Sequence, residues 1–281
     1  MANFSDIASR PAATSPNGRA EFAAEIEAGW LQGRVAFGGL QGALGAIAMR
    51  AAVGDAPMLR ALQATFVGAV QPGPARAIAS VVRRGRAVVH AQCTLWSGDA
   101  PAALFVGLYG AARASKVRVD MPSPEGLQGP DALRETPYMP DRMPGFLQHY
   151  AQRWAGGAPP YSGRPYRPAS LWTRLREAAP ATGEPPAALA TPAVREANLV
   201  AVADLPPSPA LSMLESRAPG ASLTWLLEFV EDPRTVDPAA WTLLHTETRH
   251  AADGYTSQTA RLWDAAGRPL AVSHQTTAIF D

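Results

Sequence analysis

The sequence is poor in cysteine and has almost no excess of either charge, and each shortage excludes a class of protein. Cys93 is the one cysteine among 281 residues. No disulfide framework can therefore form within the chain, and we expect a reducing, cytoplasmic compartment. The 25 basic and 24 acidic residues leave a formal net charge of +1. That balance gives no support for nucleic-acid binding, which usually requires a basic excess.

Long apolar runs are also lacking. A transmembrane helix needs about 20 consecutive apolar residues, and the most apolar region, residues 37–53, is interrupted by four glycines, Gln41 and Arg50. We therefore expect no membrane span. Residues 1–18 lack a basic segment followed by an apolar one, so we expect no secretory signal and a flexible N-terminus.

The familiar catalytic and binding motifs are missing. The chain has no G-x-S-x-G elbow, no P-loop, no C-x-x-C or H-E-x-x-H pattern and no G-x-G-x-x-G, so we expect no metal and no dinucleotide cofactor. Cys93 could be a nucleophile, but a small core residue in a strand explains it more simply. The histidines are scattered and fit ordinary strand or surface positions, with His274 the least certain of them because it precedes Gln275.

Two segments have helical spacing and many small residues. Residues 37–53 place apolar side chains three and four positions apart, with glycine and alanine between them, which is typical of a helix enclosed closely by backbone. Pro192 fits the first turn of a second helix over residues 192–203. Pro206 and Pro207 predict that this helix ends before them.

Each predicted helix is followed by four short runs of strand character, separated by turns that contain glycine, proline or aspartate. Such runs indicate antiparallel hairpins and meanders. Earlier strands near residues 19–30 and 171–177 are expected to complete each sheet. The four-strand runs cover residues 61–70, 76–82, 87–96 and 102–109, and then 222–230, 241–249, 255–263 and 270–280.

The two sets of elements match in order and in spacing. Phe66 and Phe229 are 163 residues apart, and Trp96 and Trp263 are 167 apart. A helix followed by a four-strand meander therefore occurs twice, which indicates an internal duplication. Each half would wrap an antiparallel sheet around its own apolar helix, giving an α+β fold.

The composition changes between the two halves. Residues 121–165 contain nine prolines and six glycines, which is typical of a long surface connection. We therefore expect four parts, namely a flexible N-terminus (1–18), an N-terminal half (19–112), a Pro/Gly-rich linker (113–145) and a C-terminal half (146–281).

Several fragments in order resemble the acyl-CoA thioesterase II family. The resemblance spans residues 20–281 and implies a double hot-dog fold, with two antiparallel sheets, each wrapped around a central helix, that form one continuous sheet. The fragments are VAFGGLQGAL at 35–44, LQATF at 62–66, QPG at 71–73, RRGR at 83–86, VADL at 202–205, WTLL at 241–244 and AVSHQ at 271–275.

The resemblance also implies the site residues. That family hydrolyses fatty acyl-CoA with an Asp, a Thr or Ser and a Gln that hold the attacking water, and these fall on Asp204, Ser222 and Gln275. Placing Ser222 requires about three extra residues in the loop over residues 231–240, so Thr224 stays an alternative. Gly38 and Gly39 begin the first helix, where unpaired N–H groups and the absence of a Cβ suit oxyanion binding.

Each of these residues also has a purely structural interpretation. Asp204 could be a turn residue, Gln275 an outward strand residue and Ser222 part of a polar strand face, while Gly38 and Gly39 could serve close packing. The chemistry is nevertheless consistent, because a carboxylate can take a proton from water while a hydroxyl and an amide orient that water.

The leading interpretation is hydrolysis of acyl-CoA to free acid and CoA without a cofactor, with acyl-CoA as the partner. An acyl-CoA or acyl-chain binding protein is the alternative from another class. A hydratase or dehydratase on the same fold ranks lower, because that chemistry normally uses an Asp–His pair. A homo-oligomer through sheet or helix faces stays open.

The duplication offsets also predict the number of sites. In the first half they place residues 50–51, Leu59 and Leu108 where the second half has the three site residues. None of these side chains can activate water, so we expect one site per chain, between the two halves.

Overall fold

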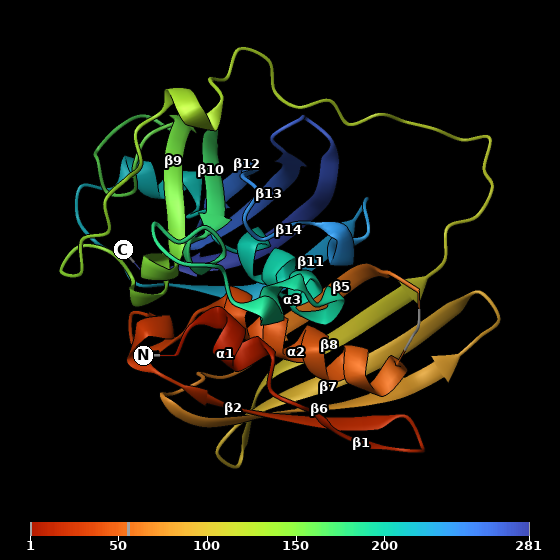
Figure 1. The fold of residues 1–281 in the computed structure, drawn as a ribbon. Coiled ribbons are helices and arrows are strands. Elements are labelled where there is room, and N and C mark those ends of the chain that lie inside the picture. The colour runs from red at the N-terminus through yellow and green to blue at the C-terminus, as the bar shows by residue number, and fades with distance from the viewer. Residues whose placement is uncertain (1, 55–56, 281) are drawn as a thin grey trace.

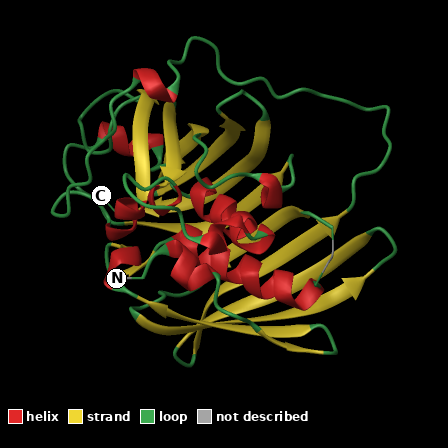
Figure 2. Ribbon diagram, in the orientation of Figure 1, coloured by secondary structure: helices red, strands yellow, loops and turns green. Residues whose placement is uncertain are grey.

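The structure is a computed structural model that describes residues 2–54 and 57–280. Within these ranges twelve antiparallel strands form one continuous sheet, and two long helices lie together on one side of it (Figures 1 and 2). In sheet order the strands are β1 (Ala13–Ser15), β2 (Arg19–Ile26), β6 (Gly73–Arg84), β7 (Val88–Ser97), β8 (Ala100–Gly110), β5 (Leu59–Phe66), β11 (Gly220–Phe229), β14 (Pro269–Ile279), β13 (Tyr255–Asp264), β12 (Thr242–Ala252), β10 (Ala169–Leu175) and β9 (Tyr150–Gly156).

Shorter elements connect these strands. A separate hairpin pairs β3 (Leu31–Gln32) with β4 (Val35–Ala36). No helix in the described part of the chain is long and apolar enough to cross a membrane. The short 3₁₀ helices of the described residues are η1 (Ala28–Trp30), η2 (Pro130–Ala132), η3 (Gly145–His149), η4 (Arg176–Ala178), η5 (Ala187–Ala190), η6 (Pro209–Met213) and η7 (Pro233–Thr235).

The sheet has an internal symmetry that confirms the repeated order of elements. β5 and β11 pair at its centre, with Leu62 opposite Leu227. Outward from this pair, β8, β7, β6 and β2 follow on one side, and β14, β13, β12 and β10 follow in the same order on the other. The predicted α+β architecture with one continuous sheet is therefore confirmed.

The two predicted helices are confirmed as α2 (Gly38–Val53) and α3 (Pro192–Ala203). Most of α2 is buried, which explains its glycines. A Cβ on Gly42 would lie 2.7 Å from the ring of Trp225, and one on Gly45 would lie 2.7 Å from the ring of Phe105. Glycine thus lets the aromatic side chains of the sheet lie directly against the helix backbone.

α2 and α3 run antiparallel and contact each other at both ends. The start of α2 meets the end of α3, where a Cβ on Gly39 would lie 2.5 Å from the carbonyl oxygen of Ala201. At the opposite end, Arg50 of α2 forms a 2.6 Å ion pair with Glu196 of α3, whose side chain is 1% exposed. The Arg50 guanidinium also lies 4.6 Å from the ring centre of Tyr109. A buried ion pair therefore joins the two halves.

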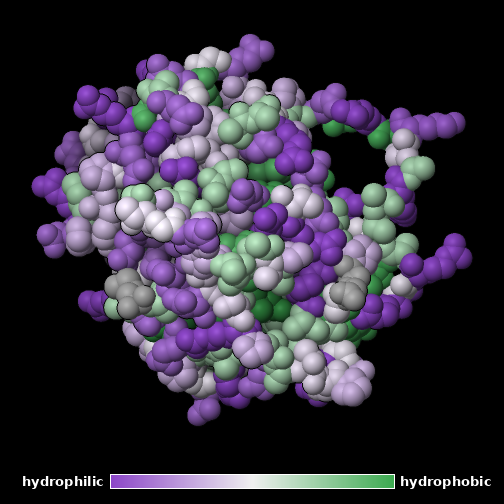
Figure 3. Space-filling view, viewed as in Figure 1, coloured by the Kyte–Doolittle hydropathy of each residue, from purple (hydrophilic) through white to green (hydrophobic). Residues whose placement is uncertain are grey.

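The connection between the halves partly covers the outer face of the sheet, which is the face away from α2 and α3. Trp172 Nε1 donates to the carbonyl oxygen of Gln128 at 3.0 Å, and Trp263 Nε1 donates to that of Met121 at 2.9 Å. Residues 111–120 are exposed, and the chain arches away from the body there (Figures 1 and 3). The assignment of residues 113–145 as the linker remains a prediction.

The N-terminal segment differs from the flexible chain that the sequence suggested. Helix α1 (Phe4–Ala8) buries Phe4 and Ile7. Ser5 donates to the carboxylate of Glu177 from its backbone N–H at 2.8 Å and from its hydroxyl at 2.7 Å. A few apolar side chains suffice here because the folded protein offers them a surface, and no local pattern in the sequence reveals that surface.

The buried pair between α2 and α3 yields a stability prediction. Glu196→Gln keeps the side-chain shape but removes the negative charge that the buried Arg50 guanidinium contacts at 2.6 Å. We expect the free energy of unfolding to fall by about 3–5 kcal/mol, measured by urea denaturation followed by tryptophan fluorescence. Asp120→Asn, at the exposed pair with Arg118, is the control and should change it by less than about 0.5 kcal/mol. Equal effects of the two substitutions would contradict the assigned role.

Candidate active site

Asp204 lies immediately after α3, where the end of that helix meets the start of α2. The helix ends there because Pro206 and Pro207, which follow closely, have no N–H to continue it. The Asp204 carboxylate faces the first turn of α2, and a Cβ on Gly38 would lie 2.7 Å from its Oδ2. The backbone N–H of Gly39 donates to the carboxylate. The N-terminus of a helix is a favourable place for a negative charge.

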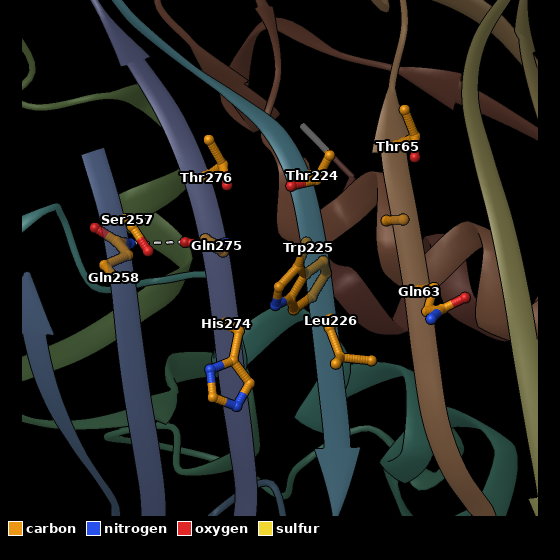
Figure 4. Close-up of a pocket in the computed structure, with 11 residues that line it drawn as sticks. Gln63, Thr65, Thr224, Trp225, Leu226, Ser257, Gln258, His274, Gln275 and Thr276 are labelled. Carbon is orange, nitrogen blue, oxygen red and sulfur yellow. Dashed lines mark hydrogen bonds between the residues drawn. The ribbon is translucent and has the colours of Figure 1, made fainter. Parts of the chain in front are cut away.

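Gln275 meets Asp204 from the sheet. It lies on β14 opposite Trp225 of β11 and Gln258 of β13, and only 8% of its surface is exposed. Its Nε2 donates to Oδ1 of Asp204. Its Oε1 accepts a 2.7 Å hydrogen bond from Nε2 of Gln258 (Figure 4). The structure therefore brings together Asp204 and Gln275, which are 71 positions apart in the sequence.

The surroundings of Asp204 set its proton affinity near neutrality. Burial raises the pKa of the Asp204 carboxyl from 3.8 to about 7, although the hydrogen bonds from Gln275 and from the Gly39 N–H oppose the rise. Desolvation penalises the charged form, whereas donors to the carboxylate favour it. A carboxylate with such a pKa can accept a proton at neutral pH and release it again.

Ser222 and Thr224 lie on opposite faces of β11. Ser222 is opposite Thr277, whose hydroxyl is 2.5 Å from that of the buried Thr256. This register places Ser222 on the helix-facing side together with Gln275. A register shift separates Ser222 from Thr224, and Thr224 is exposed on the outer face (Figure 4). In the described part of the chain, no hydrogen bond joins Ser222 to Asp204 or Gln275.

A cavity of about 360 Å³ lies on the outer face of the central strands. Figure 4 looks onto this face, with the helices behind the sheet. Asp204 does not line the cavity, so the sheet separates this opening from the carboxylate. Its lining residues are Gln63, Ala64, Thr65, Thr224, Trp225, Leu226, Ser257, Gln258, His274, Gln275 and Thr276.

No pattern in the sequence identified two of the residues near Asp204. Gln258 is one polar residue among many on a strand, and only the pairing of β13 with β14 brings it to Gln275. Tyr150 is buried, and its hydroxyl has no hydrogen-bond partner in the described part of the chain. Burial raises the pKa of Tyr150, and the nearby charges of Glu177 and Asp204 raise it further. Tyr150 is therefore a neutral neighbour of the carboxylate.

The cysteine and His149 lie in surroundings that favour a structural role over a catalytic one. Cys93 is buried, and burial raises the pKa of its thiol to about 12, which disfavours a thiolate nucleophile. His149 stacks on Trp30 with ring centres 3.9 Å apart, and burial lowers the pKa of His149 to about 4. Within residues 2–54 and 57–280, no three His, Cys, Asp or Glu side chains gather in a way that could hold a metal ion.

Comparison with known families identifies the chain. Residues 26–110 match the model of the acyl-CoA thioesterase N-terminal domain, and residues 124–279 match that of the acyl-CoA thioesterase C-terminal domain. The chain belongs to the acyl-CoA thioesterase family. No curated protein sequence matches this family member.

Solved structures share the fold of this acyl-CoA thioesterase family member. A hot-dog protein of unknown function from Alicyclobacillus acidocaldarius has a TM-score of 0.80 at 18% identity, covering 100% of this chain and 99% of the other. A candidate thioesterase II from Thermobifida fusca has a TM-score of 0.76 at 19% identity, covering 100% and 98%. Acyl-CoA thioesterase II TesB2 from Mycobacterium marinum has a TM-score of 0.66 at 14% identity, covering 96% of each chain. The predicted hot-dog fold is therefore confirmed.

The raised pKa of Asp204 predicts how stability depends on pH. The folded chain retains the Asp204 proton up to about pH 7, whereas the ordinary pKa is 3.8. Wild type should therefore lose stability relative to Asp204→Asn as pH rises between these values, by roughly 1.4 kcal/mol for each pH unit. Above that window the difference should stay constant. Denaturant unfolding of both proteins from pH 4 to pH 9 measures it, and a difference that does not change with pH would contradict the assigned environment.

Proposed function

We propose that this chain hydrolyses an acyl-CoA thioester to a free acid and CoA, with Asp204 as the general base. The observation that supports this most strongly is the position of its carboxylate. Burial raises its pKa to about 7, Gln275 donates to it, and the first turn of α2 lies beside it. Family membership supports thioester hydrolysis in general, whereas the acyl group and the roles of single residues are part of the proposal.

The reaction needs a nucleophile, a proton acceptor and a stabilised oxyanion. Water attacks the thioester carbonyl carbon while the Asp204 carboxylate takes one of its protons. The tetrahedral oxyanion then collapses, the carbon–sulfur bond breaks, and the protonated Asp204 returns the proton to the departing CoA thiolate. No covalent enzyme intermediate forms, and the carboxylate is regenerated. General-base assistance of this kind contributes roughly 10²–10⁴-fold.

The remaining groups position the water and the oxyanion. Ser222 is our choice for the hydroxyl that holds the water, because the strand register puts it on the side of Gln275 and puts Thr224 on the other side. One N–H of Gln275 is directed at Asp204, which leaves its second N–H for the water oxygen. The Gly39 N–H also donates to Asp204, so we assign the oxyanion chiefly to the Gly38 N–H at the start of α2.

Release of free thiol from a panel of acyl-CoAs of different chain length, followed with a thiol reagent, tests the function itself. Turnover well above the background rate is expected with at least one acyl-CoA. Saturable binding of the panel without thiol release would instead indicate an acyl-CoA binding protein.

The assigned residues predict a graded series of variants. Asp204→Asn keeps the shape but removes the base, and we expect kcat to fall about 10²–10⁴-fold with the fold unchanged. Gln275→Ala should be similarly severe. Ser222→Ala should lower kcat by an intermediate amount, because water can partly replace one hydroxyl. Thr224→Ala, on the opposite face of the same strand, is the matched control and should retain wild-type turnover. Near wild-type hydrolysis by Asp204→Asn would remove this mechanism.

The chain should have one working site despite its duplication. With the 163-residue offset, Leu62 of β5 corresponds to Trp225 of β11, and Leu62 is opposite Gly107 where Trp225 is opposite Gln275. The first half therefore has no amide at the equivalent place. The opposite end of the helix pair holds the buried ion pair instead of a reactive carboxylate.

Calorimetric titration with a non-hydrolysable acyl-CoA analogue should accordingly give one binding site per chain. Two equivalent sites per chain would contradict the proposed division of labour between the halves.

A further inference from the structure

Gln258 extends the polar contacts of the site by one strand. It is opposite Gln275 in the ladder between β13 and β14, it is 5% exposed, and its Nε2 donates to Oε1 of Gln275 at 2.7 Å. Gln275 in turn donates to Oδ1 of Asp204. A continuous chain of donors therefore runs from Gln258 through Gln275 to the carboxylate, and Figure 4 shows its first hydrogen bond, between Gln258 and Gln275.

The direction of these hydrogen bonds matters because an amide has a donor end and an acceptor end of nearly the same shape. If the Gln275 amide turned over, its carbonyl oxygen would face the Asp204 carboxylate, and two acceptors would repel each other. The donor from Gln258 opposes this rotation as long as Gln258 keeps its own orientation, because it requires an oxygen, not an NH₂ group, on its side of Gln275. This bond is the one hydrogen bond of the Gln258 amide in the described part of the chain, because its Oε1 is buried and has no partner there.

We propose that Gln258 is a positioning residue, whose amide holds the Gln275 amide in the orientation that presents an N–H group to Asp204. Its kinetic consequence rests on the proposed function, whereas the orientation itself can be tested without turnover. Gln258 does not need to touch the substrate in this role. It acts by favouring the ionised form of Asp204, because a donor stabilises the carboxylate and a carbonyl oxygen in its place would stabilise the protonated acid.

The other groups around Asp204 do not obscure the effect of Gln258 on the ionisation of Asp204. On α2 the carboxylate meets the backbone of Gly38 and Gly39, which does not titrate. On β9 the titratable neighbour is Tyr150, and burial raises its pKa, so that it stays neutral across the working range. Glu177 interacts with Tyr150 and accepts two hydrogen bonds from Ser5. The substitutions below change none of these three residues.

Two substitutions at this position distinguish orientation from simple packing. Gln258→Met keeps the length and removes the donor, so the Gln275 amide is free to turn. Gln258→Glu offers only acceptors and a negative charge, so it should take the Gln275 N–H for itself and turn the carbonyl oxygen towards Asp204. Ser257→Ala, on the adjacent exposed position of the same strand, is the matched control.

The first measurement is the pH dependence of kcat/KM. In Gln258→Glu we expect the apparent pKa of the acid limb to rise by about one unit, which lowers the ionised fraction at pH 7 about fivefold. Gln258→Met should shift the limb in the same direction by a smaller amount, with KM unchanged, and Ser257→Ala should not shift it. If Gln258→Glu does not fold, the result for Gln258→Met decides the question.

The second measurement does not need catalysis. The free energy of unfolding is measured against pH for each Gln258 variant, alone and combined with Asp204→Asn, and the difference within each pair reports the protonation of Asp204. The window in which that difference changes should extend to higher pH in Gln258→Met than in wild type. An unmoved window would overturn the positioning role even if hydrolysis is confirmed. A moved window in a protein that hydrolyses no acyl-CoA would support the positioning role and reject the proposed function.

Discussion

The contact between the Asp204 carboxylate and the first turn of α2 is the interaction on which the rest of the site depends. It brings a charged group into a desolvated place, where burial raises its pKa, and surrounds it with two N–H donors that oppose the rise. The contact is possible only because Gly38 lacks a side chain, since a Cβ there would collide with Oδ2. The C-terminal half supplies the carboxylate and the N-terminal half supplies the helix start, so this contact joins the two halves.

The duplicated architecture makes two such helix junctions, and the sequence uses them differently. At one junction a carboxylate meets a glycine-rich helix start. At the other, Arg50 and Glu196 neutralise each other, and the Arg50 guanidinium lies over the Tyr109 ring. A buried ion pair loses most of its value if either partner is removed, so this junction favours a fixed relation between α2 and α3. That fixed relation keeps Gly38 and Gly39 in place against Asp204 at the opposite end.

The inner surface of the sheet carries several buried polar side chains beside Asp204. Gln275 and Gln258 are buried there next to Trp225, whose Nε1 donates to Ser273 Oγ at 2.8 Å. Buried polar groups are stabilising when they are hydrogen-bonded and costly when they are not. A connected row of amides and hydroxyls under a helix end supports the proposed site. The outer cavity lies on the other side of the strands, and Asp204 does not line it.

Much of the fold could be predicted because its signals are local. The apolar spacing of residues 37–53 and the prolines around residues 192–203 are short-range patterns, and both helices follow them. The order of elements along the chain followed from a repeat that the sequence carries twice. By contrast, the burial of Phe4 and Ile7 in α1 depends on a surface built by distant residues, and a polar or weakly apolar terminus gives no sign of it.

The sequence by itself determined the two helices, the repeated order of elements and the place of Asp204 at a helix end, since each depends on neighbouring residues. The tertiary structure decided which side chains meet that carboxylate. A register shift in β11 sends Ser222 and Thr224 to opposite faces, strand pairing brings Gln258 to Gln275, and the antiparallel helices direct the Gly39 N–H to Asp204. These outcomes depend on contacts between residues far apart in the chain, and a one-residue change of register reverses the face of every side chain in a strand.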